Sequence, residues 1–309
     1  LLIDEYLGHE TELDVDAAAD GEQVLVGAIM EHLEQAGIHS GDSTCFIPTQ
    51  NISQEMLKRV DEQTRIIGLK LKIKGCYNIQ FAIQGDNLYC LEVNPRSSRT
   101  VPFVAKSTGL PMARIAARIT IGIPLSQQEI PRRTTGHVCV KAPVFPFIKL
   151  RGLDPAPGPE MKSTGEVFGS DNRADLAYLK ARLATEIPVA TEGGAYLTVR
   201  EEDKVALIPI AQSLIDINFT IFATPGTADV LRKANIPVTT SYRIAERMHP
   251  DSLDLMRKGD VNFIVNVPTI SGGAVRDGNM MRRLAVELNI PFVTTMRGAV
   301  MEVAAMKAR

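Results

Sequence analysis

The stretch CYNIQFAIQGDNLYCLEVNPRSSRTVPF, residues 76–103, indicates a β-hairpin followed by a polar turn. Two runs rich in apolar residues, 76–84 and 88–94, flank Gly85-Asp86-Asn87. Small and polar residues between two such runs are typical of a hairpin loop. The sequence therefore predicts two antiparallel strands in this region.

The polar side chains of the hairpin are expected on one face. Strand side chains alternate between faces, so Glu92 and Asn94 point together. If all three turn residues form the loop, Gln84 pairs with Leu88, and counting back places Gln80 opposite Glu92. A two-residue loop would shift the partners by one and turn the faces over, so this register is a hypothesis.

Oxygen ligands followed by cationic side chains predict a phosphoryl-transfer site. The carboxylate of Glu92 and the amide of Asn94 suit Mg²⁺ or Mn²⁺. Arg96 and Arg99, just beyond, can hold phosphate oxygens that the metal also touches. The pattern favours nucleotide-dependent phosphoryl transfer, with Gln80 as a third member of the polar face.

The composition is that of a globular protein with two or three compact units. The chain has 309 residues, 45% of them hydrophobic, and 34 Lys and Arg against 36 Asp and Glu. The net charge therefore gives no indication of a nucleic-acid or membrane partner.

The cysteines favour reduced structural thiols, because Cys45, Cys76, Cys90 and Cys139 are widely spaced. No apolar run approaches the roughly 18 residues needed to span a bilayer and no signal sequence is found, so we expect a cytoplasmic protein.

Residues 9–20 alternate as a half-buried strand does, and a second strand is expected over 22–34. One face of the first strand carries Leu13, Val15 and Ala17, and the other carries Glu12, Asp14 and Asp16. A solvated strand face is the ordinary explanation of three such carboxylates. A polar loop over 36–43 and an amphipathic helix over 53–70, begun by Ser53, complete this part.

Strand and helix patterns alternate in the last third of the chain. Before it, a short helix is expected over 112–121, and a connector rich in Pro and Gly runs over 126–190 with one helix near 174–184. The alternating elements are strands at 195–199, 220–223 and 262–266, and helices ending at 217 and 234, over 277–289 and over 298–307. This rhythm predicts an α/β fold whose last domain is a doubly wound parallel sheet.

Three segments carry a resemblance to a known family. MEHLEQAGIHSGDS (30–43), LEVNPRSSRTVPFVAKSTG (91–109) and GPEMKSTGEVFG (158–169) closely resemble the large chain of carbamoyl-phosphate synthase. That family carries two homologous synthetase halves of ATP-grasp type and a C-terminal domain that resembles methylglyoxal synthase and binds effectors. The resemblance implies the C-terminal part of an ATP-grasp domain over 1–125, with an antiparallel sheet, a connecting region over 126–187, and a Rossmann-like allosteric domain over 188–309.

The resemblance also implies a reaction, the ATP- and metal-dependent phosphorylation of carbamate to carbamoyl phosphate, which feeds pyrimidine and arginine biosynthesis. By motif match, the metal ligands are Gln80, Glu92 and Asn94, and the catalytic arginines are Arg96 and Arg99. The implied ATP contacts are Glu5 and Leu7 near the base, Glu12 at the ribose, the loop Gly37, Ile38, His39 and Ser40, and Gln80 and Glu92. For His39 the residues alone favour equally a loop histidine bonded to backbone. Asp14 and Asp16 keep a solvated or structural role.

An effector site is implied in the last domain. Thr224-Pro225-Gly226-Thr227 follows a predicted strand and opens a predicted helix, so hydroxyls and free N–H groups meet at a helix end where a phosphate can bind. In the family the matching threonines bind a nucleotide effector, of the uridine or inosine monophosphate type. Matching positions then give the effector-binding set Lys204, Thr224, Thr227, Arg243 and Asn266.

The implied partners are the N-terminal portion of the large chain, the small glutaminase subunit, the nucleotide effector, and further copies of this chain in a homo-oligomer. No segment of this sequence matches the glycine-rich lobe that covers the phosphates in the family, so the chain alone is expected to be inactive. The alternative is a stand-alone regulatory module, in which residues 188–309 sense a nucleotide and the first half is a non-catalytic ATP-grasp remnant. Methylglyoxal synthase activity is disfavoured, because no Asp or His cluster suited to proton transfer stands beside Thr224.

Overall fold

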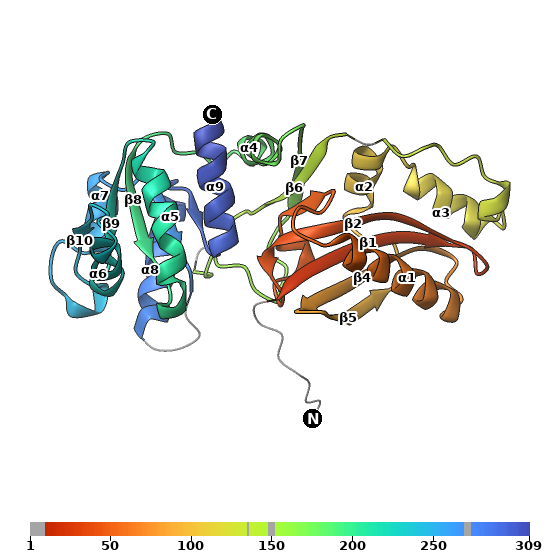
Figure 1. The fold of residues 1–309 in the computed structure, drawn as a ribbon, viewed down its shortest axis with the longest axis horizontal. Coiled ribbons are helices and arrows are strands. Elements are labelled where there is room, and N and C mark those ends of the chain that lie inside the picture. Colours follow the sequence, from red (N-terminus) through yellow and green to blue (C-terminus); the bar gives the residue numbers. More distant parts are fainter. Residues whose placement is uncertain (1–9, 135, 148–151, 269–272) are drawn as a thin grey trace, which may run out of the picture. The chain divides into compact units, whose positions relative to one another are not determined.

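A computed structural model describes residues 10–134, 136–147, 152–268 and 273–309, and the chain forms two compact units (Figure 1). The first unit runs to Pro143 and also takes Pro159–Met161 and Glu166–Ala177. The second takes Val144–Gly158, Lys162–Gly165 and Tyr178–Arg309. The described residues form a seven-stranded and a five-stranded sheet. The functional boundaries proposed at residues 125 and 187 stay predictions.

The seven-stranded sheet is built mainly from antiparallel pairs, as predicted. Its strands are β1 (Thr11–Ala19), β2 (Val24–Gln35), β3 (Cys45–Ile47), β4 (Gly75–Gln84), β5 (Asn87–Asn94), β6 (Val138–Val144) and β7 (Gly165–Asp171). They lie in the order β5-β4-β1-β2-β3-β6-β7. The central strand β1 is antiparallel to both β2 and β4, and β5 follows β4 at the edge. Strand β3 was missed because three residues are too few to show an alternation. Strands β6 and β7 were missed because prolines obscure the alternation around 138–171.

Helix α1 (Gln54–Lys70) packs on one face of this sheet. It begins as predicted at Ser53, whose hydroxyl accepts a hydrogen bond from the Met56 N–H at 3.2 Å. Val60 of α1 shares a core with Leu13, Val15, Ala17 and Ala19 of β1. The odd-numbered residues of β1 therefore face α1.

Helices α2 (Val101–Thr108) and α3 (Met112–Thr120) cover part of the opposite face. Ala18 of β1 shares a second core with Val104 and Ile115 of these helices. The even-numbered side chains of β1 that precede Ala18 are all acidic, and they continue this face as a polar surface. Helix α2 was not predicted. Its proline, Pro102, lies in the first turn, where the missing N–H breaks no helical hydrogen bond.

The five-stranded sheet is parallel and doubly wound, which confirms the predicted fold class. It consists of β8 (Gly193–Thr198), β9 (Phe219–Ala223), β10 (Thr239–Thr240), β11 (Phe263–Asn266) and β12 (Phe292–Val293) in the order β10-β9-β8-β11-β12. The helices are α5 (Lys204–Ile215), α6 (Pro225–Lys233), α7 (Ser252–Lys258), α8 (Gly273–Glu287) and α9 (Met296–Ala308), and α4 (Ala174–Ala184) precedes them in the chain. Contacts of α5 with α6 and α9, and of α7 with α8, mark two helical layers. The chain order reverses between β8 and β11, and such a switch point opens a crevice at the carboxyl ends of the strands.

The cysteines and helices give two further facts. Cys45, Cys76 and Cys139 are buried, Cys90 is exposed, and none of the four forms a disulfide. Within the described ranges, none of the helices combines the length and the apolar character needed to cross a membrane.

Candidate functional site

Three neighbouring strands of the first unit form a polar floor. One row of paired residues across these strands consists of Asp14, Gln80 and Glu92, and the next row consists of Asp16, Asn78 and Asn94. Glu12 lies further along β1. Gln80 lies opposite Glu92, as predicted. Glu92 and Asn94 share a face, because the Asn94 amide nitrogen donates a hydrogen bond to Glu92 Oε1 at 2.7 Å.

The register is right for a different reason from the one predicted. Gln84 pairs with Asn87, so the loop has two residues instead of three, and the predicted Gln84–Leu88 pair is wrong. The register then shifts between Gln80 and Phe81, where Leu91 is an extra residue on β5. A β-bulge of this kind re-aims the following side chains. The bulge restores the pairing that the short loop would have displaced.

The acidic part of the polar floor is buried, so the predicted solvated face is wrong. The exposed fractions are 2% for Glu12, 1% for Asp14 and 1% for Asp16. Alternation in a sequence gives the side of the sheet on which a residue lies, but not what covers it. The pKa of Glu12 is raised to about 7, mainly by burial. Asp14 acts in the same direction, whereas His32 and the Gly37 N–H act in the opposite direction.

Asp16 ties the turn after β5 to the polar floor. Its carboxylate accepts hydrogen bonds from Ser98 Oγ at 2.7 Å, Thr100 Oγ1 at 2.6 Å and Asn78 Nδ2 at 3.0 Å. Burial raises the pKa of Asp16 to about 6, although these three donors act in the opposite direction. The structural role considered for Asp16 is the one that the contacts describe.

The turn held by Asp16 carries the two predicted catalytic arginines. Arg96 is exposed, and its Nη2 lies 3.4 Å from Asn94 Oδ1. Arg99 is half-buried and its Nη1 lies 3.0 Å from Met161 Sδ. Arg96 is thus joined directly to the polar floor, whereas Arg99 lies beside the segment around Met161.

The loop over 37–40 lies against the same floor. The Gln80 amide nitrogen donates to Ser40 Oγ at 2.8 Å, and Lys141 Nζ donates to the Ser40 carbonyl at 3.0 Å. His39 Nδ1 accepts a hydrogen bond from the Gly41 N–H at 3.0 Å, which is the backbone contact considered as its alternative role. The structure therefore brings Ser40 and Gln80 together, and the Gly37 N–H of the same loop is a hydrogen-bond partner of Glu12. The predicted base contacts Glu5 and Leu7 lie outside the described residues.

A buried histidine that the sequence reasoning missed faces the acidic side chains. His32 of β2 is 0% exposed, with Nδ1 at 3.5 Å from Glu12 Oε1 and Nε2 at 3.8 Å from Asp14 Oδ2. Burial lowers its pKa, but Cys45, Asp14 and Glu12 together raise it well above the ordinary value. Charged, His32 offsets part of the negative charge of the floor. The signal was its place on β2, the strand that pairs with β1.

The donor atoms of the floor fit a hard divalent cation. A carboxylate from Glu92 and amide oxygens from Gln80 and Asn94 are the ligand types that Mg²⁺ and Mn²⁺ prefer. The Gln80 nitrogen is used by Ser40, so its oxygen is the amide atom left for a cation. A bound cation would also relieve the repulsion between Glu92 and the buried acids.

The second unit holds a pocket of about 310 Å³ at the switch point of the parallel sheet. All five residues of the predicted effector set line it: Lys204, Thr224, Thr227, Arg243 and Asn266. Thr224 follows β9 and precedes α6, and Asn266 ends β11. The carboxyl ends of adjacent strands thus gather residues that lie far apart in the sequence.

The charges of this pocket, named here the effector pocket, are mixed. Arg200 also lines it, as do Glu201 and Asp277, which the sequence reasoning missed. Lys204 forms an ion pair with Glu201, whose side chain is 84% exposed. A phosphate could replace this exposed carboxylate as the partner of Lys204, because a surface ion pair is worth little.

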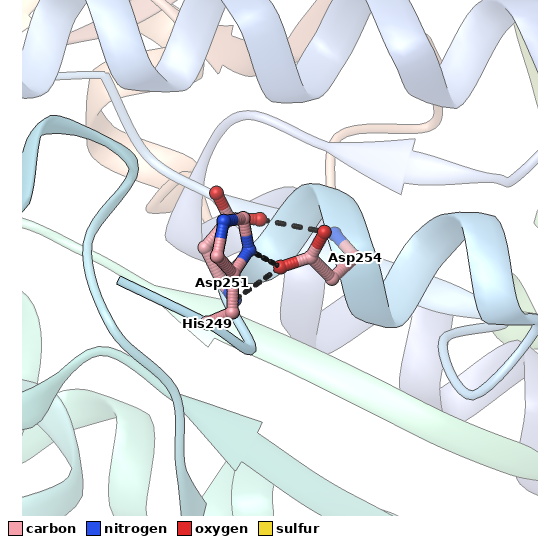
Figure 2. A group of neighbouring side chains, drawn as sticks. All are labelled: His249, Asp251 and Asp254. Carbon is pink, nitrogen blue, oxygen red and sulfur yellow. Dashed lines mark hydrogen bonds and ion pairs between the residues drawn. The ribbon is translucent and has the colours of Figure 1, made fainter. Parts of the chain in front are cut away.

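A polar cluster at the start of α7 has a structural explanation. His249 Nδ1 lies 2.5 Å from Asp254 Oδ2, and the Asp251 N–H donates to the same oxygen at 2.9 Å (Figure 2). Asp251 Oδ1 in turn accepts from the Asp254 N–H at 3.0 Å, which completes a capping box. Helix capping accounts for these contacts, and none of the three residues lines the effector pocket.

Comparisons with known proteins match both units. Residues 1–128 match the family model of the carbamoyl-phosphate synthase L chain, ATP binding domain, and residues 206–294 match the model of the MGS-like domain. A carbamoyl phosphate synthase large chain of Methanosarcina barkeri is 43% identical over 308 residues, which cover 99% of this chain and 77% of that protein.

Two further relatives are longer. The C-terminal section of the carbamoyl phosphate synthase large chain of Methanocaldococcus jannaschii is 43% identical over 320 residues, covering 100% of this chain and 52% of that protein. The large chain of Methanocorpusculum labreanum is 43% identical over 308 residues, covering 100% of this chain and 29% of that protein. The chain thus spans about half of one relative and less than a third of the other.

Proposed function

Because this chain belongs to the family of carbamoyl-phosphate synthase large chains, we propose that it forms the C-terminal section of such a protein. In this proposal the first unit contributes the metal-binding floor of an ATP site that phosphorylates carbamate. The second unit binds a nucleotide effector. The N-terminal portion of the large chain and a small glutaminase subunit supply the other steps.

One observation carries the catalytic part of the proposal, the alignment of Gln80, Glu92 and Asn94 on one face beside the buried acids. Mg²⁺ or Mn²⁺ held by these three residues would neutralise charge on the β- and γ-phosphates of ATP. The loop over 37–40 and Glu12 then lie where the nucleoside would be bound. These positions agree with the family's roles for the matching residues.

The reaction needs orientation and charge stabilisation more than proton transfer. A carbamate oxygen attacks the γ-phosphorus, an O–P bond forms to give carbamoyl phosphate, and the bond to the departing ADP oxygen breaks. Carbamate is already an anion, so no protein base has to remove a proton. Arg96 and Arg99 take up negative charge on the phosphoryl group while it is transferred.

The reverse reaction tests this role in the complete large chain that contains this segment. ATP formation from ADP and carbamoyl phosphate should fall about 100-fold or more in Glu92→Gln, since such an exchange removes a charge-stabilising group. Glu22→Gln is the matched control, because Glu22 is exposed in the turn between β1 and β2. An unchanged rate in Glu92→Gln would overturn the proposed metal-binding floor. Residues 1–309 alone should show no turnover.

The gathering of five predicted residues in one pocket supports the effector role. Calorimetry with uridine and inosine monophosphates should detect binding to the chain, and Thr224→Ala or Arg243→Ala should abolish it. Glu92→Ala should bind both nucleotides normally, since Glu92 belongs to the other unit. If the complete protein bound these nucleotides but never catalysed the reverse reaction, the regulatory-module alternative would replace the enzyme proposal.

A further inference from the structure

A buried arginine joins the effector pocket to a distant segment of the second unit. Arg282 of α8 is 2% exposed. Its Nε donates to Asp154 Oδ1 at 2.8 Å and its Nη2 donates to Asp154 Oδ2 at 2.5 Å. The third nitrogen, Nη1, donates to the side-chain oxygen of Asn266. One guanidinium therefore uses all three nitrogens on two partners.

This arrangement fixes which end of the Asn266 amide is available to a ligand. A guanidinium has only N–H donors, so the atom that faces Arg282 has to be the amide oxygen. Asn266 lines the effector pocket. Because its oxygen is held by Arg282, its Nδ2 group, with two hydrogens, is the part left to contact a ligand. Asn266 thus offers a donor to an acceptor atom of that ligand.

The packing around this pair leaves little room for another arrangement. A Cβ at Gly278, which also lines the effector pocket, would lie 2.9 Å from Arg282 Nη1 and 3.2 Å from Asn266 Oδ1. The α8 backbone therefore comes close to the pair from the pocket side. A residue larger than glycine at this position would push the two side chains apart.

The other partner of Arg282 is itself held in place. Asp154 Oδ1 also accepts a hydrogen bond from the Ala156 N–H at 2.9 Å. Lys162 Nζ donates to the Asp154 carbonyl at 3.1 Å and to the Ala156 carbonyl at 2.7 Å. A carboxylate fixed in this way binds Nε and Nη2 of the guanidinium, and this contact orients the remaining nitrogen, Nη1, towards Asn266.

We propose that Arg282 is a positioning residue for effector recognition, which holds the Asn266 amide so that its nitrogen donates to an acceptor atom of a bound nucleoside monophosphate. Asp154 holds Arg282 in the required orientation. This inference rests on the proposed effector function of the second unit. Arg282 does not line the pocket, so it acts through Asn266.

Calorimetry on residues 1–309 with uridine and inosine monophosphates tests the inference. Arg282→Lys should weaken binding of at least one nucleotide about tenfold, because a lysine ammonium is a point charge and cannot hold both partners in a fixed fork. Asp154→Asn should weaken it in the same direction. Arg283→Lys is the matched control, since Arg283 is the next residue of α8 and is exposed. It should bind like the unaltered chain.

A double-variant cycle separates positioning from a general structural effect. In an Asn266→Ala background, Arg282→Lys should cause no further loss, because the amide that it orients is gone. Losses that add in the double variant would overturn the inference, as would normal binding by Arg282→Lys alone. If the unaltered chain bound neither nucleotide, the proposed effector function would fail and the inference with it. Normal binding by both the unaltered chain and Arg282→Lys would refute only the positioning role.

Discussion

Glu12→Gln should stabilise the folded chain at neutral pH, although it removes a residue of the proposed ATP site. Glu12 is 2% exposed, and burial raises its pKa from an ordinary 4.5 to about 7. Glutamine has nearly the same shape and carries no charge to bury. The variant therefore tests directly whether the acidic face of β1 is buried.

The magnitude and the sign follow from proton linkage. Each pKa unit corresponds to about 1.4 kcal/mol, so a rise from 4.5 to about 7 lowers the free energy of unfolding by about 3 kcal/mol once Glu12 is ionised. The folded chain keeps a proton that the unfolded chain releases above pH 4.5. The contribution of Glu12 to the free energy of unfolding is thus fully present below pH 4.5 and is lost as the pH rises through 7. The attraction between Glu12 and His32, 3.5 Å apart, is already part of this raised pKa, so the gain expected from the variant stays at about 3 kcal/mol.

Urea unfolding followed by circular dichroism at about pH 4, 6 and 8 measures this difference. The free energy of unfolding of Glu12→Gln, relative to the unaltered chain, should rise by about 3 kcal/mol over this range. Glu22→Gln, which removes an exposed carboxylate from the adjacent turn, is the control. A difference that stays constant with pH would refute the reasoning, because a solvated Glu12 has no proton linkage of this size.

Three further variants test the packing by thermal unfolding. Gly194→Ala should lower the free energy of unfolding by about 3 kcal/mol, because its Cβ would lie 2.0 Å from the Asp260 carbonyl oxygen. A normal melting temperature would show that this strand can move aside. Glu302→Ala should cost about 3–5 kcal/mol, because it removes the buried carboxylate that lies 2.9 Å from the half-buried Arg182. A loss no larger than that of Glu302→Gln would contradict this. Ser53→Ala should cost about 1 kcal/mol by removing the cap of α1, whereas no change would mean that water replaces the hydroxyl.

The sequence predicted the positions of the polar residues better than their surroundings. Alternation along β1 and β5 correctly placed Glu12 with Asp14 and Glu92 with Asn94. It could not show that the acids are buried, because the residues that contact them come from β2, from the loop over 37–40 and from the turn after β5. Their burial depends on pairings between segments that no local pattern specifies.

The effector pocket shows the same division. Thr224 could be predicted from its place between a strand and a helix, whereas Asn266, which ends β11, was predicted only from the family resemblance. Arg282 could not be predicted from the pattern of α8. Its importance depends on Asp154, which lies 128 residues away and belongs to a segment without regular structure.

The two sites differ in the changes of sequence that they tolerate, because one is built on the face of a sheet and the other at strand ends. On a face, a slip of one residue reverses every side chain. With a two-residue loop and no bulge, Glu92 would oppose Ile79 and enter the core beside α1, and Leu91 would take its place opposite Gln80. Glu92 therefore stays over the floor because Leu91, which is 41% exposed and belongs to neither core, is bulged out of the pairing. At the strand ends of the second unit no such alternation has to be kept, so the loops around the effector pocket can change length while the strands still deliver Thr224 and Asn266 to the same crevice.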